Sequence, residues 1–171
     1  MIQEILIVDG YNIIGAWPEL QRLKELSLEE ARDRLIDIMA EYQSFSGMKV
    51  IVVFDAYYVP GLGKKYLQRK LSVYYTKEKE TADELIERLV TENIGRRKQI
   101  YVATNDMTEQ HVIFGKGAAR LPSGELLVKV RQSRQEIRQR IHENKNVRPG
   151  AVEGRLKEDV RDLLEKWRRG R

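Results

Sequence analysis

Residues 4–13 read EILIVDGYNI and residues 50–56 read VIVVFDA, and these two stretches decide the fold. Each is a short, continuous apolar run that stops at an aspartate, Asp9 in the first and Asp55 in the second. Such a run is typical of a strand that is covered on both faces of a parallel sheet. Both stretches therefore predict central strands whose carboxyl ends carry an acid.

The segment between these strands predicts a helix over residues 27–45. Ser27 and Glu30 have the spacing of a capping box, and Gly47 is a suitable helix end. The apolar positions lie on one helical face and are Leu28, Ala31, Leu35, Ile38, Met39 and Tyr42. A strand, a helix and a strand in this order make a βαβ unit with parallel strands.

The alternation of strands and helices continues along the chain. Further strands are expected at residues 71–76, 99–103 and 126–130. Further helices are expected from Thr81 to just before Gly95, at 108–114, at 133–142, and in the last part of the tail. This order predicts an α/β fold, a doubly wound, mainly parallel sheet with helices on both faces, followed by basic C-terminal helices.

Composition limits the kind of site that the chain can build. The chain of 171 residues is expected to form one domain, residues 1–171. It contains no cysteine and only two histidines, His111 and His142, which are too few for a zinc site. A bound metal must therefore have oxygen ligands, which favours Mg²⁺, Mn²⁺ or Ca²⁺.

The net charge of +5 comes from the C-terminal extension, residues 131–171. This segment has 13 Lys and Arg against 7 Asp and Glu. The imbalance favours a polyanionic partner, although a solvated basic helix is a common alternative. No apolar run approaches membrane-spanning length, and the first residues show no basic leader, so a cytoplasmic protein without a membrane partner is expected.

Four acids are predicted to meet at one edge of the sheet. Asp9, Asp55 and Asp106 each stand at or just beyond the carboxyl end of an expected strand, and Asp83 stands in the first turn of a helix. In an open parallel sheet the carboxyl ends of the strands form the ligand-binding edge. Clustered carboxylates repel one another unless a proton or a cation offsets their charge, so a divalent cation is the expected occupant. Such a cation can activate water for phosphodiester hydrolysis.

Each of these acids also has a purely structural explanation. Asp83 and Asp106 are suited to helix starts, and Asp9 and Asp55 to ordinary turns after strands. The joint pattern is more specific than any single residue. Asn12 is placed to orient Asp9 or to contact a phosphate, and Glu80 is a candidate outer ligand.

A second group of residues predicts binding of single-stranded nucleic acid. Residues 56–77 contain no acid, and they interleave five tyrosines with basic residues, among them Lys64, Lys65, Arg69 and Lys70. Cations for phosphates and rings for base stacking are what such a ligand requires. The alternative is that tyrosines such as Tyr74 line the core of the 71–76 strand.

Four motifs together resemble the NYN-domain branch of the PIN-like nucleases, and more closely its YacP type. They are DGYNI at 9–13, VVFDA at 52–56, ETADELI at 80–86 and VATND at 102–106. The resemblance implies a PIN-like fold and a bacterial, ribosome-associated endoribonuclease that uses Mg²⁺ or Mn²⁺. It implies an active site at Asp9, Asp55, Asp83 and Asp106, for which we expect Asp9, Asp83 and Asp106 as principal ligands, Asp55 in support and Asn12 beside them.

The same resemblance implies messenger RNA on translating ribosomes as the substrate. It also implies that the basic tail, with Arg134 and Arg138, docks on ribosomal RNA. Two other hypotheses remain at this point. One is an RNA- or ribosome-binding protein whose acids bind metal for structure only. The other is a receiver-like signalling module that uses Asp9, Asp55 and Thr104, with Lys129 as its partnering cation.

Overall fold

The computed structural model describes residues 1–56, 65–68, 70–106, 115–145 and 163–164. In these ranges the chain forms a six-stranded sheet with helices on both faces. The strands are β1 (Gln3–Asp9), β2 (Lys49–Phe54), β3 (Lys65–Gln68), β4 (Leu71–Tyr75), β5 (Lys98–Ala103) and β6 (Ala119–Leu121). The helices are α1 (Gly10–Ala16), α2 (Pro18–Leu26), α3 (Leu28–Ser46), α4 (Ala82–Asn93) and α6 (Ser123–Lys145).

The sheet is mainly parallel, as the sequence predicts. Its strand order is β3-β4-β2-β1-β5-β6, and only the pairing of β3 with β4 is antiparallel. The central strand β1 pairs with β2 and β5 in parallel, with Asp9 opposite Val53 and Val8 opposite Ala103. All the carboxyl ends of the parallel strands therefore point to one edge.

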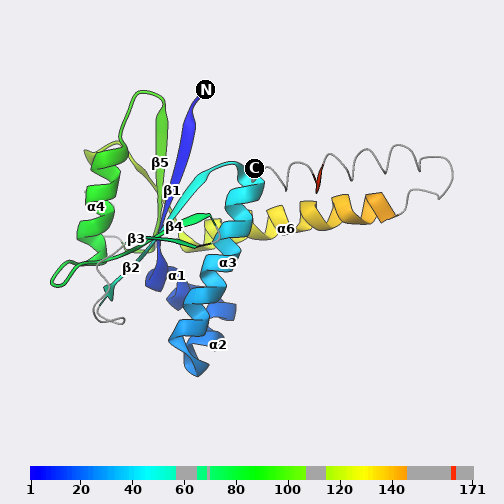
Figure 1. Ribbon diagram of the computed structural model, residues 1–171, viewed down its shortest axis with the longest axis horizontal. Coiled ribbons are helices and arrows are strands. Elements are labelled where there is room, and N and C mark those ends of the chain that lie inside the picture. Colours follow the sequence, from blue (N-terminus) through cyan, green and yellow to red (C-terminus); the bar gives the residue numbers. More distant parts are fainter. Residues whose placement is uncertain (57–64, 69, 107–114, 146–162, 165–171) are drawn as a thin grey trace. The chain divides into compact units, whose positions relative to one another are not determined.

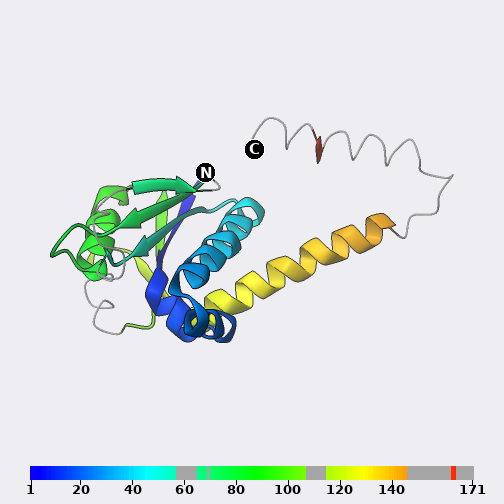
Figure 2. The ribbon, with the colours of Figure 1, turned by 60° about the horizontal axis from the view of Figure 1, so that its bottom comes forward.

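Side-chain alternation along the strands divides the core into two layers. Even-numbered residues of β1, such as Leu6 and Val8, pack with α1, α2 and α3 and with the first turns of α6. Odd-numbered residues, such as Ile5 and Ile7, pack with α4. Figures 1 and 2 show α4 on one side of the sheet and α1–α3 on the other. The doubly wound α/β arrangement is confirmed.

The predicted helix starts are confirmed by their caps. Ser27 Oγ accepts a hydrogen bond from Glu30 N at 3.3 Å, and Thr81 Oγ1 accepts one from Glu84 N at 3.2 Å. Gly47, with a φ of 75°, ends α3 in the left-handed conformation that glycine adopts without steric cost.

The strand expected at residues 126–130 is wrong, because these residues are helical. They belong to α6, which starts at Ser123 directly after Pro122. Leu126, Val130 and Ser133 are its buried residues beyond the first turn, and a spacing of four and three residues is the period of a helix. The separate helix expected to start at Ser133 is therefore the continuation of α6, and the edge strand is β6 instead.

Other short elements were not expected from the sequence. They are α1, α2, β3 and β6, all of nine residues or fewer. The predicted helix at 108–114 lies outside the described residues. So does the predicted last helix, apart from Leu163 and Leu164, which are helical and exposed.

By its internal contacts the chain divides into two compact units, Met1–Ser133 and Arg134–Arg171. The first unit contains the sheet and both core layers. The expectation of one domain with a basic extension stays a prediction. In the described ranges, no helix is both long and apolar enough to cross a membrane.

Candidate active site

Asp9 lies at the carboxyl end of β1 and is only 9% exposed. Side chains alternate between the two faces of a strand, so the Asp9 side chain points to the same face as Ile5 and Ile7. This is the face of the sheet that α4 covers. Asp83 stands in the first turn of α4. The alternation of β1 and the start of α4 thus bring these two acids to one place.

The environment of Asp9 raises the pKa of its carboxyl group from 3.8 to about 6. Burial is the main cause, because it disfavours the charged form, and the negative charges of Asp83 and Asp106 add to the increase. The hydroxyl of Thr104 and the backbone N–H of Asn12 act in the opposite direction. Three acids thus share one electrostatic site.

One buried hydroxyl joins two of these acids. Thr104 follows β5 and is fully buried. Its Oγ1 donates to Asp9 Oδ2 at 3.3 Å and accepts from the backbone N–H of Asp106 at 3.0 Å. Thr104 therefore fixes the backbone of Asp106 relative to the carboxylate of Asp9.

A second network fixes Asn12 and the start of α6. The side-chain oxygen of Asn12 accepts from the backbone N–H of Asn105 at 2.8 Å. The Asn105 amide then binds Ser123 twice, donating to Oγ at 2.6 Å and accepting from the backbone N–H at 3.0 Å. Trp17 Nε1 donates to the Ser123 carbonyl at 2.9 Å. Asn12 thus orients the loop after β5, and its contact to a phosphate stays a prediction.

Sequence reasoning missed Asn105, Ser123 and Trp17 as parts of this site. Asn105 stands inside the VATND motif, directly before Asp106, and that position was the available signal. Ser123 and Trp17 gave none, because they lie 18 and 106 residues from their hydrogen-bond partners, Asn105 and Ser123.

The remaining acids have different surroundings. Asp55 follows β2 and is half-buried. In the strand register Asp9 lies opposite Val53, so Asp55 stands two residues further along than the position opposite Asp9. This offset amounts to about 7 Å along the strand. Both carboxylate oxygens of Glu80 are engaged by Arg88, at 2.8 and 3.5 Å. This pairing orients Glu80 towards Arg88, so its expected role as an outer ligand gains no support.

The type of ligand atom at this site, carboxylate oxygen, suits a hard divalent cation. Asp9, Asp83 and Asp106 offer only carboxylate oxygens, which Mg²⁺ and Mn²⁺ prefer. Within the described ranges, however, no three acidic or histidine side chains are gathered closely enough to hold a metal ion together.

Four of the predicted RNA-binding residues other than Lys65 are described with their side chains, and their surroundings differ. Lys64 and Arg69 lie outside the described residues, and Lys65 begins β3. Lys70, exposed and with a φ of 63°, forms the turn between β3 and β4, whereas Tyr74 is half-buried against the α4 side of the core. The alternative that the tyrosines line the core therefore applies to Tyr74 in part.

Arg134 is half-buried and Arg138 exposed, both on α6 in the second unit. Lys129, the cation of the receiver hypothesis, lies on α6 and not at a strand end.

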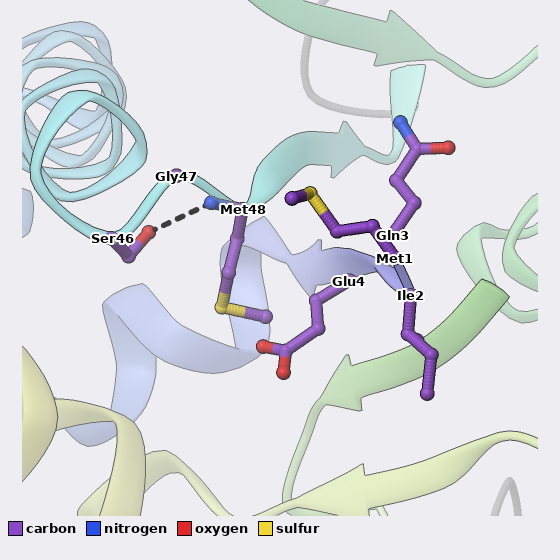
Figure 3. Close-up of a pocket in the computed structure, with 7 residues that line it drawn as sticks. All are labelled: Met1, Ile2, Gln3, Glu4, Ser46, Gly47 and Met48. Atoms are coloured by element: carbon purple, nitrogen blue, oxygen red, sulfur yellow. Dashed lines mark hydrogen bonds between the residues drawn. The ribbon is translucent and has the colours of Figure 1, made fainter. Parts of the chain in front are cut away.

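A pocket lies at the opposite edge of the sheet. It is lined by the first residues of the chain and by the turn between α3 and β2, namely Met1, Ile2, Gln3, Glu4, Ser46, Gly47 and Met48 (Figure 3). Its lining holds a single carboxylate, that of Glu4. The pocket is thus at the amino ends of the strands, away from Asp9.

Comparison with known proteins relates the whole chain to one family. The model of the YacP-like NYN domain matches residues 6–169. The uncharacterized protein YacP of Bacillus subtilis is 52% identical over 167 residues, which is 98% of each chain. The crystal structure of Rae1 (YacP) from Bacillus subtilis is 51% identical and superposes with a TM-score of 0.74, covering 97% of this chain and 95% of that one.

A second crystal structure of Rae1 (YacP), of a single-substitution mutant, is 47% identical with a TM-score of 0.76 and covers 89% of each chain. These similarities confirm the PIN-like fold that the four motifs imply. NYN domains are nucleases, so the receiver-like hypothesis no longer holds. The chain belongs to the YacP-like NYN domain family.

Proposed function

We propose that this protein is a divalent-metal-dependent endoribonuclease that hydrolyses phosphodiester bonds in single-stranded RNA. The observation that carries the proposal is Asp9, a buried acid whose pKa is raised to about 6 beside two further acids, in a member of a nuclease family. Acids with perturbed pKa values mark functional sites because the fold holds them in an environment that is unfavourable without a ligand.

Asp9, Asp83 and Asp106 are the residues that would hold Mg²⁺ or Mn²⁺, with Asp55 supporting them. When bound, the cation supplies an activated water and stabilises the charge that develops on the phosphate. Thr104 keeps the Asp9 carboxylate and the Asp106 backbone in a fixed relation. Asn12 accepts a hydrogen bond from the backbone of Asn105, directly before Asp106, and so supports the segment that carries this acid.

The protonation of Asp9 sets the pH range in which this site can work. With a pKa of about 6, Asp9 carries a proton in part of the population near neutral pH when no cation is present. Asp9 would have to lose that proton to hold a divalent cation, because metal ligands must be deprotonated. Activity at a limiting metal concentration is therefore expected to fall below about pH 6.

The substrate in the cell is proposed to be messenger RNA on translating ribosomes, in the cytoplasm. This step rests on the motif resemblance and on the basic C-terminal segment. Four arginines of α6, Arg131, Arg134, Arg138 and Arg140, lie along its C-terminal part, and three of them are exposed. Exposed cations at this density favour contacts with ribosomal RNA phosphates.

The experiment is cleavage of a labelled single-stranded RNA with Mg²⁺, with Mn²⁺ or with EDTA, by the parent protein and by Asp9→Asn and Asp83→Asn. The expected result is internal cutting that requires the metal and is lost in both variants, while circular dichroism shows a retained fold. Cutting that persists in both variants overturns the assignment of the site. Salt-sensitive RNA binding without cutting under any condition would instead support an RNA-binding protein with a structural metal site.

A further inference from the structure

We propose that Arg32, oriented by Tyr11, binds a backbone phosphate of the RNA next to the Asp9 site; the inference rests on the proposed function and extends it. Tyr11 follows Asp9 by two residues, in the first turn of α1. Arg32 comes from α3, and its Nη1 donates to the Tyr11 hydroxyl at 3.2 Å. The guanidinium is thus bound to the residue that stands two positions after Asp9.

Tyr11 is itself fixed between the ends of β1 and β2. Its ring lies 5.2 Å from that of Phe54, the buried residue that directly precedes Asp55. Phe54 in turn stacks with Tyr75 at the end of β4, with ring centroids 5.7 Å apart. Gly10 permits this close approach, since a Cβ there would lie 2.4 Å from Phe54 Cε1. Tyr11 therefore holds Arg32 at the edge of the sheet that carries the acids.

Arg32 differs from two other arginines of the same unit, Arg34 and Arg88, in its partner. Arg34 on the same helix binds Glu19 at 2.8 Å, and Arg88 binds Glu80 at 2.8 Å. Arg32 has only the neutral phenol as its partner in the described part of the chain, although Glu29 stands one turn earlier on α3. A half-buried cation without a counter-ion is unfavourable, and binding of an anion removes this cost.

The chemistry of the site identifies that anion. Asp9, Asp83 and Asp106 repel a polyanion, so substrate binding requires cations close to them but outside the metal site. A guanidinium has five N–H donors in a planar fork that matches two oxygens of a phosphate, and Tyr11 uses one of them. Contacts of this kind bind any RNA sequence equally, because the phosphate carries no base information.

The test is RNA binding measured by fluorescence anisotropy with a labelled single-stranded RNA in EDTA, where the RNA is checked by gel to remain intact. Arg32→Gln is compared with Arg34→Gln, which removes the same group from the same helix but from a paired position. Arg32→Gln is expected to weaken binding about tenfold on both uridine-rich and adenine-rich RNA. The slope of log Kd against log salt should fall by about 0.7, the value for one phosphate contact on a single strand. Arg34→Gln should change neither quantity by more than about twofold.

Two further variants distinguish phosphate binding from a structural role. Arg32→Lys keeps the charge without the fork and should bind with intermediate affinity, and Tyr11→Phe should lose less than Arg32→Gln. In the cleavage assay, Arg32→Gln should raise KM and leave kcat nearly unchanged. The inference is overturned if Arg32→Gln and Arg34→Gln bind alike, or if the parent protein binds no RNA. If Arg32→Gln alone loses binding but no protein cleaves RNA with metal, the phosphate contact stands and the nuclease proposal fails.

Discussion

The two ends of strand β1 differ in the surroundings of their acidic side chains, and this difference distinguishes a candidate active site from a surface pocket. At the amino end, Glu4 lines an open pocket but is itself exposed to water. At the carboxyl end, Asp9 is buried and feels the negative charges of two other acids, Asp83 and Asp106. The pocket leaves the Glu4 carboxylate in contact with water. At the carboxyl edge, by contrast, the Asp9 carboxylate is removed from water, and no described residue supplies an opposite charge to it. Chemistry is therefore expected at the carboxyl end, where the fold makes a charge unfavourable.

The largest expected effect separates the two ends directly. Asp9→Asn should lower RNA cleavage at least about a hundredfold, because it removes a ligand of the cation that activates water. Glu4→Gln, the matched change five residues earlier on the same strand, should leave the rate within about twofold, as surface substitutions generally do. Both are measured as kcat/KM at saturating Mg²⁺. Equal losses of kcat/KM in the two variants would contradict the assignment of the active site to the carboxyl edge of the sheet.

The stability of the protein should reveal the burial of Asp9 without any activity assay. Its pKa is 3.8 in the reference state and about 6 in the fold, so the folded state binds more protons between these values. The contribution of Asp9 to the free energy of unfolding therefore falls as the pH rises through this window and is constant above it. The total change corresponds to about 3 kcal/mol.

Urea unfolding of the parent and of Asp9→Asn in EDTA isolates this contribution. The variant should be more stable than the parent by a few kcal/mol at pH 8, and the advantage should vanish below about pH 4. Added Mg²⁺ should stabilise the parent more than the variant, since it binds the charged carboxylate. A stability difference that does not change between pH 4 and pH 8 would contradict the raised pKa.

A smaller effect is expected from the network behind the acids. Asn105→Ala removes the two contacts of the amide with Ser123 and should lower kcat about tenfold with little change in KM, because it affects the placement of Asp106 and not substrate binding. The control is Gln99→Ala, near the amino end of the same strand β5. Unfolding in urea checks that both variants keep their fold. A loss confined to KM would assign Asn105 to substrate binding instead.

The smallest effect concerns the amino edge. Burial raises the pKa of the Tyr42 phenol, and the charge of Glu4 raises it further. Glu4→Gln should therefore lower that pKa slightly, as followed by the ¹³Cζ chemical shift of Tyr42 in a pH titration. Cleavage activity should not change in parallel. A change in activity that follows the Tyr42 titration would show that the two edges are coupled.

The sequence correctly predicts those parts of the fold where the local pattern is compatible with only one secondary structure. The apolar runs that end at Asp9 and Asp55 form central strands, and Ser27 and Thr81 cap their helices as expected. The prediction fails at residues 126–130, where the short, mostly apolar sequence LLVKV is compatible with either a strand or a helix. Only the packing of Leu126 and Val130 against the core selects the helix.

The sequence by itself determined the identity of the acids, the positions along the chain of the central strands that carry them and the family to which the chain belongs. Tertiary structure alone decided that Asp9 is desolvated, that Thr104 connects it to Asp106, and that Arg32 reaches Tyr11 from another helix. The physical reason is that residue type and spacing fix local conformation, whereas burial and hydrogen bonding join residues that are distant along the chain. These two properties set the pKa of a carboxyl group and the partner of a guanidinium.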